Sequence, residues 1–180
     1  IDGAADLLEE SWQLMEELFW DADHSAYADE RDQTLDILSP YRGQNANMHA
    51  VEALLAAYES TNETRYLDRA SIISHKFTVA MTGLTNGQIW EHYTTNWQHD
   101  WYYNIDKPDD LFKPWGYQPG HQVEWAKLLL QLNRHQPADW HLDRACGLFN
   151  SAMEKGWDQV YGGLVYGYAP DNSLCDANKY

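Results

Sequence analysis

Apolar residues recur at helical spacing along two stretches of the chain. In the first stretch, the i, i+3, i+4, i+7 spacing of an amphipathic helix is kept by Met48, Val51, Leu54, Leu55 and Tyr58. In the second, the same spacing runs through the apolar positions between Val123 and Leu132. Each stretch therefore predicts a helix that turns one face toward a core.

Each predicted helix is followed by a polar break and by a second helical pattern. The breaks cover residues 60–64 and 133–137, and the second helices cover residues 65–81 and 138–155. A further helix of the second type is predicted at the start, over about residues 2–18. The pattern thus predicts two helical hairpins preceded by one helix, about five helices in all.

Short motifs repeat in step with these hairpins. An apolar or small residue, a Trp and an acid occur at residues 19–21, 89–91 and 156–158, so the Trp residues are 70 and 67 positions apart. Leu-Asp-Arg-Ala occurs at residues 67–70 and again at residues 142–145. Markers that recur together predict that a helical hairpin and the long connection after it form one structural repeat.

The long connections are rich in Tyr, Gly, Asp and Asn. In residues 161–168, alternation and glycine predict short β-hairpin strands. Helical hairpins with long loops at one end suit a closed double ring of helices, an all-α toroid, or else an open solenoid arc. A closed ring needs more hairpins than the two found here, so residues 1–180 are expected to be a partial barrel domain, truncated at both ends.

Charge and composition exclude several classes of partner. The chain carries 28 Asp and Glu against 12 Lys and Arg, a formal net charge of -16, which repels nucleic-acid phosphates. No apolar run is long enough to span a bilayer, so no membrane association is expected. The two cysteines, Cys146 and Cys175, are too few for a disulfide framework and predict free thiols in a reducing compartment. The expected location is therefore cytoplasmic.

Aromatic residues are unusually frequent, with nine Trp and twelve Tyr among 180 residues. Trp and Tyr pack well in cores, and their flat faces also stack against the C–H faces of sugars. Most of them are expected in the core and a few at a sugar site. Trp90, in one of the repeated motifs, is the candidate for such a site.

A His followed three residues later by a Glu occurs at corresponding positions of the two hairpins, as His49 with Glu52 and His121 with Glu124. Each pair lies on one face of a helix, near its N-terminus and beside a long loop. There the helix dipole disfavours imidazolium, so the histidine is expected to stay neutral near pH 7. A neutral imidazole beside a carboxylate is a good general base. His121 and Glu124 are therefore the catalytic candidates.

The segments before both histidines contain glycine. A Pro-Gly pair before the second histidine predicts a tight turn, where the backbone can approach a ligand closely. Residues 42–48 precede the first histidine in a similar way. Asn45 or Asn47 could cap the helix there, and Arg42 could hold a substrate oxygen. Arg42, Asn45 and His49 are therefore candidate substrate-binding residues.

Other interpretations of these residues remain open. A single His-x-x-Glu pair on a helix is more often a surface or capping pair than a site. The two His and two Glu could also hold a metal, as in carboxylate-bridged helical bundles, although the sequence does not fix the distance between hairpins. The remaining histidines lack repeat partners and are expected at the surface or in loops: His24, His75, His92, His99, His135 and His141.

Three motifs resemble those of the N-acylglucosamine 2-epimerase superfamily, which includes cellobiose 2-epimerases and the mannose and sulfoquinovose isomerases. The motifs are residues 42–53, Trp90-Glu91-His92-Tyr93 and Pro119-Gly120-His121-Gln122-Val123-Glu124-Trp125. Together they extend the resemblance over nearly the whole chain, and the last is the most specific. The Asn-Ala-Asn-Met-His at residues 45–49 is more similar to the mannose isomerase branch than to the epimerases.

The resemblance implies an (α/α)6 barrel and proton transfer through a cis-enediolate, with no metal or other cofactor. His121 matches one of two histidines that relay the proton at C2 of the sugar, and the second is expected beyond Tyr180. In that family the positions of Asn45, His49 and Glu124 surround the sugar. An arginine that steadies the enediolate is expected N-terminal to this chain.

The resulting hypothesis is a cofactor-free aldose–ketose isomerase that interconverts D-mannose, or a close relative, and D-fructose. A sugar 2-epimerase is the nearest alternative, since it shares the proton abstraction and differs in where the proton returns. From another class, an α/α-barrel glycoside hydrolase could use Glu91 and Glu124 as paired carboxylates, or the chain could be a non-catalytic sugar-binding scaffold. The expected partner is a small sugar, and the oligomeric state stays open.

Overall fold

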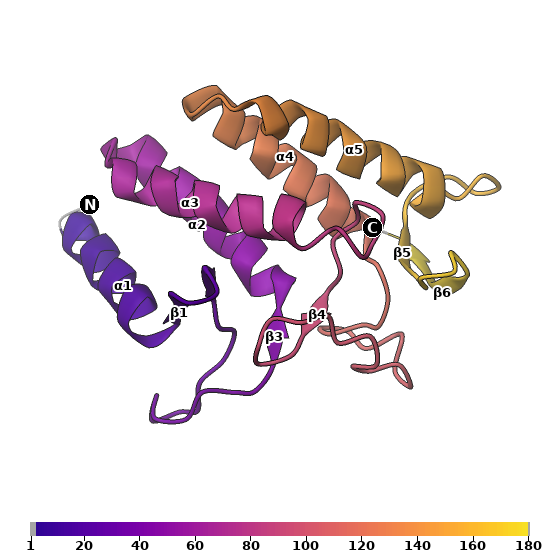
Figure 1. Cartoon of the computed structure of the whole chain (residues 1–180), viewed down its shortest axis with the longest axis horizontal. Helices are drawn as coiled ribbons and strands as arrows, with labels where there is room; N and C mark the ends of the chain where they lie inside the picture. The colour runs from indigo at the N-terminus through magenta and orange to yellow at the C-terminus, as the bar shows by residue number, and fades with distance from the viewer. Residues whose placement is uncertain (1–2, 180) are drawn as a thin grey trace.

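The chain folds into helices joined by long loops that carry short strands (Figure 1). The computed structural model describes residues 3–179. The helices are α1 (Ala4–Leu18), α2 (Gln44–Thr61), α3 (Thr64–His75), α4 (Pro119–His135) and α5 (Asp139–Gly156), and the π-helical turn η1 (Lys76–Ala80) continues α3. The strands are β1 (Trp20–Asp21), β2 (Ala26–Tyr27), β3 (Arg42–Gly43), β4 (His92–Tyr93), β5 (Val165–Tyr168) and β6 (Leu174–Lys179).

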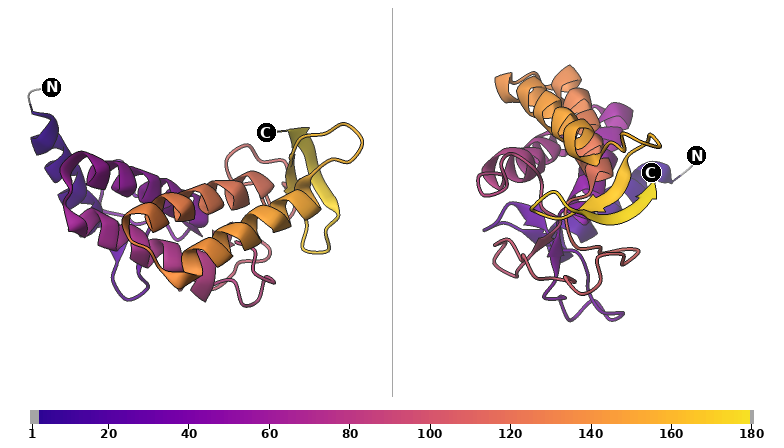
Figure 2. Two further views of the ribbon diagram at one scale, coloured as in Figure 1. Left: turned by 90° about the horizontal axis from the view of Figure 1, so that it is seen from above. Right: turned by 90° about the vertical axis from the view of Figure 1, so that its right-hand side faces the viewer.

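Two helical hairpins form the body of the structure. Helix α2 packs against α3, α4 packs against α5, and α4 also packs against both helices of the first hairpin. Figure 2 shows these helices running side by side, with α1 next to the first hairpin at the N-terminal end. The predicted helices, their order and their pairing into hairpins are confirmed.

Local sequence explains where the helices begin and end. Asn62 adopts a left-handed φ of 61° and ends α2, a conformation that asparagine tolerates better than most residues. Pro119 lies in the first turn of α4, where its missing N–H would have no helical partner. Pro137 lies two residues beyond the end of α4 and favours an extended chain before it. The hairpins therefore turn where the sequence contains residues that suit a turn.

The core lies where the two hairpins meet. Trp125, Leu129 and Leu132 of α4 are each 0% exposed, and their spacing of four and three places them on one helix face. The ring of Phe77 stacks on that of Trp125, with centroids 6.0 Å apart. Full burial of one large apolar side chain stabilises a fold by about 1.5–3 kcal/mol. This face therefore holds α4, including its first turn, firmly in place.

The second helix of the first hairpin differs from the single helix predicted over residues 65–81. Helix α3 ends at His75 and continues as a π turn, in which Met81 N–H donates a hydrogen bond to the carbonyl of Lys76 at 3.0 Å. Phe77 and Thr78 are both 0% exposed although they are adjacent. The apolar pattern alone indicates neither the wider turn nor the burial of Thr78.

Three antiparallel two-stranded sheets lie in the loops: β1 with β2, β3 with β4, and β5 with β6. The third confirms the strands expected in residues 161–168, with β5 beginning at Val165. In the sheet formed by β3 and β4, Gly43 lies opposite His92. Gly43 directly precedes α2, and Glu91 directly precedes β4. This small sheet therefore brings Glu91 next to the start of α2.

Residues 3–179 can be compared with the expectations about membrane spans, cysteines and metal ligands. None of the helices between residues 3 and 179 is long and apolar enough to cross a membrane. Cys146 is exposed and Cys175 is half-buried, and both are free thiols, as predicted. Within this range, no group of three or more His, Cys, Asp or Glu side chains is placed to hold a metal ion.

Candidate functional site

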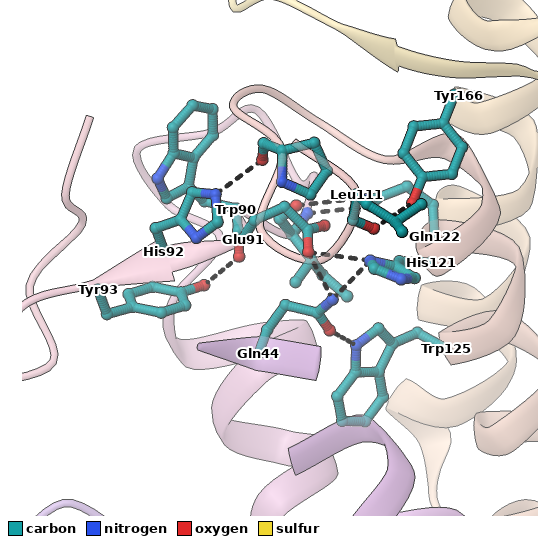
Figure 3. A network of polar contacts seen from close by, with 12 residues as sticks. Gln44, Trp90, Glu91, His92, Tyr93, Leu111, His121, Gln122, Trp125 and Tyr166 are labelled. Atoms are coloured by element: carbon teal, nitrogen blue, oxygen red, sulfur yellow. Dashed lines mark hydrogen bonds and ion pairs between the residues drawn. The ribbon is translucent and has the colours of Figure 1, made fainter. Parts of the chain in front are cut away.

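The start of α4 carries the histidine that the sequence singled out. Pro119 and Gly120 form the first turn, and the side chain of His121 is 20% exposed. Its Nδ1 lies 2.9 Å from Oε2 of Glu91, a side chain that is 5% exposed (Figure 3). His121 thus contacts a buried carboxylate that lies 30 residues away in the sequence.

Neighbouring groups hold the segment that carries Glu91. Gln122 accepts a hydrogen bond from Ile89 N–H at 3.0 Å and donates one to the Ile89 carbonyl at 2.9 Å. The carbonyl oxygen of Glu91 accepts a hydrogen bond from Gln44 N–H at 3.1 Å. The first residues of α2 and of α4 therefore fix this segment from two sides.

Gln44 and Trp125 complete the cluster around the carboxylate. Gln44 Nε2 donates to Glu91 Oε2 at 2.8 Å and lies 2.9 Å from His121 Nδ1, while its Oε1 accepts from Trp125 Nε1 at 2.6 Å. Figure 3 shows the four side chains converging between the starts of the two helices. Sequence reasoning gave Gln44 and Trp125 no role, although both stand in the motifs that contain the histidines.

The pKa of His121 is raised above its ordinary value. Burial by itself lowers the pKa, but the charge of Glu91, its hydrogen bond to the ring and the charge of Glu124 together outweigh burial. The expectation that the position at a helix N-terminus disfavours the imidazolium form of this ring is therefore wrong in direction. A carboxylate at hydrogen-bond distance acts more strongly on a titrating ring than the partial charge of a helix end. The hydrogen-bonded partner is also Glu91, whereas the sequence predicted Glu124.

Glu124 instead faces the cleft between α2 and α4. It is exposed and lines a small hollow there together with His49, Glu52 and Lys127. His49 Nδ1 lies 3.4 Å from Glu52 Oε2, and Lys127 Nζ lies 3.0 Å from Glu52 Oε1. The structure therefore brings two of the predicted site residues, His49 and Glu124, onto one exposed surface beside the start of α4.

The two asparagines of the first motif do not cap α2. The helix begins at Gln44, directly after Gly43 and before either asparagine, and no side chain caps it. Asn47 Oδ1 accepts from Tyr27 N–H at 2.8 Å, and its Nδ2 donates to the Tyr27 carbonyl at 2.9 Å, so it ties β2 to α2. The Oδ1 atom of Asn45 is buried and has no hydrogen-bond partner among residues 3–179. Asn45 therefore keeps an acceptor that a ligand could use.

Arg42 and Trp90 hold the fold together in this structure. Arg42 is 6% exposed, and its Nη1 donates to the carbonyls of Ser39 at 2.6 Å and Tyr41 at 2.7 Å. Trp90 is 0% exposed, and its Nε1 donates to the Asp100 carbonyl at 3.0 Å. Trp90 therefore presents no open face, whereas Nε of Arg42 is buried and has no hydrogen-bond partner among residues 3–179. Contact of either side chain with a substrate stays a prediction.

Two of the remaining histidines are buried, contrary to the expectation that they lie at the surface or in loops. His92 is 1% exposed; its Nε2 donates to the Pro114 carbonyl at 2.8 Å and its Nδ1 accepts from the Tyr41 hydroxyl at 2.9 Å. His141 is 0% exposed and packs against Trp140, with ring centroids 4.1 Å apart. Burial lowers the pKa of both rings, so both are neutral near pH 7 and act in packing.

Asp29 anchors the turn that leads into α2. Its Oδ2 accepts a hydrogen bond from Gly43 N–H at 2.7 Å. A Cβ atom at Gly43 would lie 2.6 Å from the Tyr41 hydroxyl and 2.9 Å from Asp29 Oδ1, so this close approach requires glycine. Burial raises the pKa of Asp29 to about 7, although the N–H of Gly43 and the cation of Lys113 both lower it. The carboxyl therefore resists ionisation in the folded protein.

We expect Asp29→Asn to gain thermal stability relative to the wild type as the pH rises. The folded pKa of about 7 lies above the ordinary value. The protonated carboxyl therefore makes its full contribution to the free energy of unfolding below about pH 4. This contribution is lost between about pH 4 and neutrality, by at most about 1.4 kcal/mol per pH unit. Asparagine keeps the acceptor for Gly43 N–H and does not ionise. Melting temperatures of both proteins, measured across this pH range, give the difference.

Asp32→Asn is the matched control for that measurement. The side chain is exposed in the same loop, and the N–H of Ile37 lowers the pKa of Asp32. Stability from this carboxylate is complete above its ordinary pKa of about 4 and is lost only in stronger acid. The difference in melting temperature between Asp32→Asn and the wild type should therefore stay constant between about pH 4 and neutrality. A pH-independent difference for Asp29→Asn would contradict the proposed ionisation cost.

The sequence is similar to a known protein family and to characterised members of it. The chain matches the N-acylglucosamine 2-epimerase family over residues 1–180. The D-mannose isomerase of Marinomonas mediterranea is 49% identical over 174 residues, which cover 96% of this chain and 44% of that protein. The D-mannose isomerase of Pseudomonas cannabina pv. alisalensis is 40% identical, with 89% and 40% covered. The chain thus spans less than half the length of these relatives.

Solved structures share the fold. A crystal structure of a D-mannose isomerase superposes with a TM-score of 0.97 at 48% identity, over 100% of this chain and 46% of that one. The cellobiose 2-epimerase of Spirochaeta thermophila superposes with a TM-score of 0.79 at 16% identity, over 98% and 44%. The predicted fold class, an arc of an (α/α)6 helical toroid, is confirmed. Because the family matches along the whole sequence, this chain belongs to the N-acylglucosamine 2-epimerase family.

Proposed function

We propose that this chain belongs to the catalytic domain of a cofactor-free aldose–ketose isomerase that interconverts D-mannose, or a close relative, and D-fructose. The observation that carries the proposal is the ring of His121, which a buried carboxylate holds through Nδ1 while 20% of the side chain stays exposed. A histidine held in this way suits a general base. Relatives named D-mannose isomerase, at 49% and 40% identity, support the choice of sugar.

In the proposed reaction, the second ring nitrogen of His121 takes the proton from C2 of the open-chain aldose. The electron pair of the broken C–H bond forms the C1–C2 double bond of a cis-enediolate, and negative charge moves to O1. Transfer of the O2 proton to O1 and return of a proton to C1 then give the ketose. No electrons leave the sugar, so the balance needs only groups that move protons.

We assign contacts with the sugar hydroxyls to three residues near His121. Glu124 is exposed one helical turn away and suits the proton transfer between O1 and O2. His49 lies on the same cleft, and Asn45 contributes its unpaired oxygen. We propose that the remaining walls of the barrel, and the second histidine that the family resemblance implies, come from segments outside residues 1–180.

The glycoside hydrolase alternative requires two carboxylates that can act on one glycosidic bond. Glu91 is 4% exposed, and its Oε2 already accepts hydrogen bonds within the cluster at the start of α4. It is poorly placed to protonate a glycosidic oxygen, so the geometry favours proton abstraction by His121.

Incubation of the full-length protein with D-mannose in deuterium oxide tests the proposal. NMR would follow both the products and the C2 proton. We expect fructose that carries deuterium, because the abstracted proton exchanges with solvent before it returns. Glucose with deuterium at C2 would replace the isomerase with a 2-epimerase, and absence of exchange with any simple aldose would contradict both.

A further inference from the structure

The acids of the three repeated Trp-acid pairs have different partners. Asp21 Oδ2 lies 2.8 Å from Nδ1 of His24 in its own loop, and Asp158 Oδ2 lies 2.5 Å from Nζ of Lys179. Glu91, the acid of the middle pair, reaches across to His121 at the start of the next hairpin. It is also the most buried of the three, at 5% side-chain exposure against 25% and 21%. Glu91 therefore contacts a residue of the next hairpin, whereas Asp21 contacts a histidine of its own loop.

The hydrogen bonds around Glu91 determine which ring nitrogen of His121 carries a proton. Nδ1 has two polar neighbours, Oε2 of Glu91 and Nε2 of Gln44, each at 2.9 Å. An unprotonated Nδ1 could accept a hydrogen bond from Gln44, but its lone pair would then face a carboxylate oxygen that can only accept, which is repulsive. Protonated Nδ1 instead donates a charge-assisted hydrogen bond to Oε2 of Glu91. In the neutral ring, the free lone pair is then on Nε2.

Gln44 and Trp125 keep the carboxylate in this position. The indole N–H of Trp125 can only donate, so the atom of Gln44 at 2.6 Å from it must be the amide oxygen. The amide nitrogen of Gln44 then faces Glu91 and donates to the same oxygen as the ring, at 2.8 Å. Trp125 and Gln44 are each 0% exposed, so their orientation is fixed by packing.

We propose that Glu91 is a positioning residue, which holds His121 as the Nδ1-protonated tautomer so that Nε2 exchanges the proton with the sugar. Glu91 acts through the histidine and does not touch the substrate. Proton exchange between Nε2 and the sugar rests on the proposed isomerase function. The tautomer and the pKa of His121 do not, because both are measured without a substrate. The two parts can therefore be tested separately.

The first test measures the titration of His121 in the full-length protein without any substrate. Hydrogen–deuterium exchange at imidazole carbon, followed by mass spectrometry, reports the pKa of each histidine. The charged groups that face this ring are Glu91 and Glu124, and both raise its pKa. In Glu91→Gln, which keeps size and one acceptor oxygen, the pKa of His121 should fall because a negative charge is lost. An unchanged value would overturn the proposal.

Glu59→Gln provides the matched control. Glu59 Oε1 lies 2.8 Å from Nε2 of His135, a second His–Glu pair, which joins the far ends of α2 and α4. This variant should leave the titration of His121 unchanged. Nitrogen-15 chemical shifts of the wild-type ring give an independent measurement, because the Nδ1-protonated and Nε2-protonated tautomers differ. The Nε2-protonated tautomer would overturn the proposal even if Glu91→Gln failed to fold.

The second test uses kinetics with the sugar that the wild type converts. Glu91→Gln should lower kcat by about 10- to 100-fold, as expected for loss of a partner that orients a reacting group, with little change in KM. The acid limb of kcat/KM should move to lower pH, because the base must be unprotonated and its pKa has fallen. Loss that appears only in KM, or an acid limb that does not move, would contradict the positioning role. If the wild type did not exchange the C2 proton of an aldose, only the isomerase assignment would be refuted. The titration of His121 would still decide the role of Glu91.

Discussion

Replacement of His121 by glutamine in the full-length protein should abolish exchange of the C2 proton of the sugar while the fold survives. Glutamine has a similar reach and can donate a hydrogen bond to Glu91, but it has no nitrogen that titrates near neutral pH. Loss of a positioned general base costs about 10² to 10⁴ in rate. Deuterium incorporation at C2, followed by proton NMR in deuterium oxide, measures this loss directly.

His135→Gln is the control for that substitution. His135 also pairs with a glutamate and lies at the opposite end of α4, so its loss should leave exchange unchanged. Circular dichroism and melting temperature would establish that both variants are folded. If the His121 variant kept the wild-type exchange rate, His121 could not be the base, and the scaffold interpretation would gain support.

Replacement of Gly116 by alanine should be the most destabilising of the single-methyl changes near the site. Gly116 has a φ of +110°, and a Cβ atom there would lie 2.6 Å from the backbone oxygen of Tyr168. That oxygen accepts a hydrogen bond from Tyr117 N–H at 2.8 Å, in the bridge that docks the start of α4 onto β5. Backbone strain at such a φ costs about 1–3 kcal/mol, and the contact with a fixed carbonyl adds to it. We expect a loss of about 3 kcal/mol or more in unfolding free energy.

Gly83→Ala separates this effect from the general cost of replacing glycine. Gly83 is exposed, and a Cβ atom there would have no neighbour within 4 Å. Its variant should stay within about 0.5 kcal/mol of the wild type. Denaturant unfolding of the three full-length proteins compares them. Equal stability of the Gly116 and Gly83 variants would refute the requirement for glycine in the bridge.

The fold was predictable from sequence because its signals are local. The apolar spacing in the helices, the turn residues Asn62 and Pro119, and the repeated Trp-acid markers each depend on residues close together in the chain. The π turn after His75 was not predictable, because the apolar spacing over residues 65–81 continues through it, and Phe77 and Thr78 are buried against other elements of the fold. Burial of His92 and His141 was missed for the same reason.

The sequence by itself determined the hairpin architecture and the family. It also made His121 the candidate base, since the helix start, the Pro-Gly pair and the histidine stand within one motif. Tertiary structure decided the partner of that histidine. A helical interval of three residues made Glu124 the obvious neighbour, but the β3–β4 pairing and the hydrogen bonds of Gln44 bring Glu91 closer. Such a contact spans loops whose geometry follows from packing of the whole chain, and no local pattern records it.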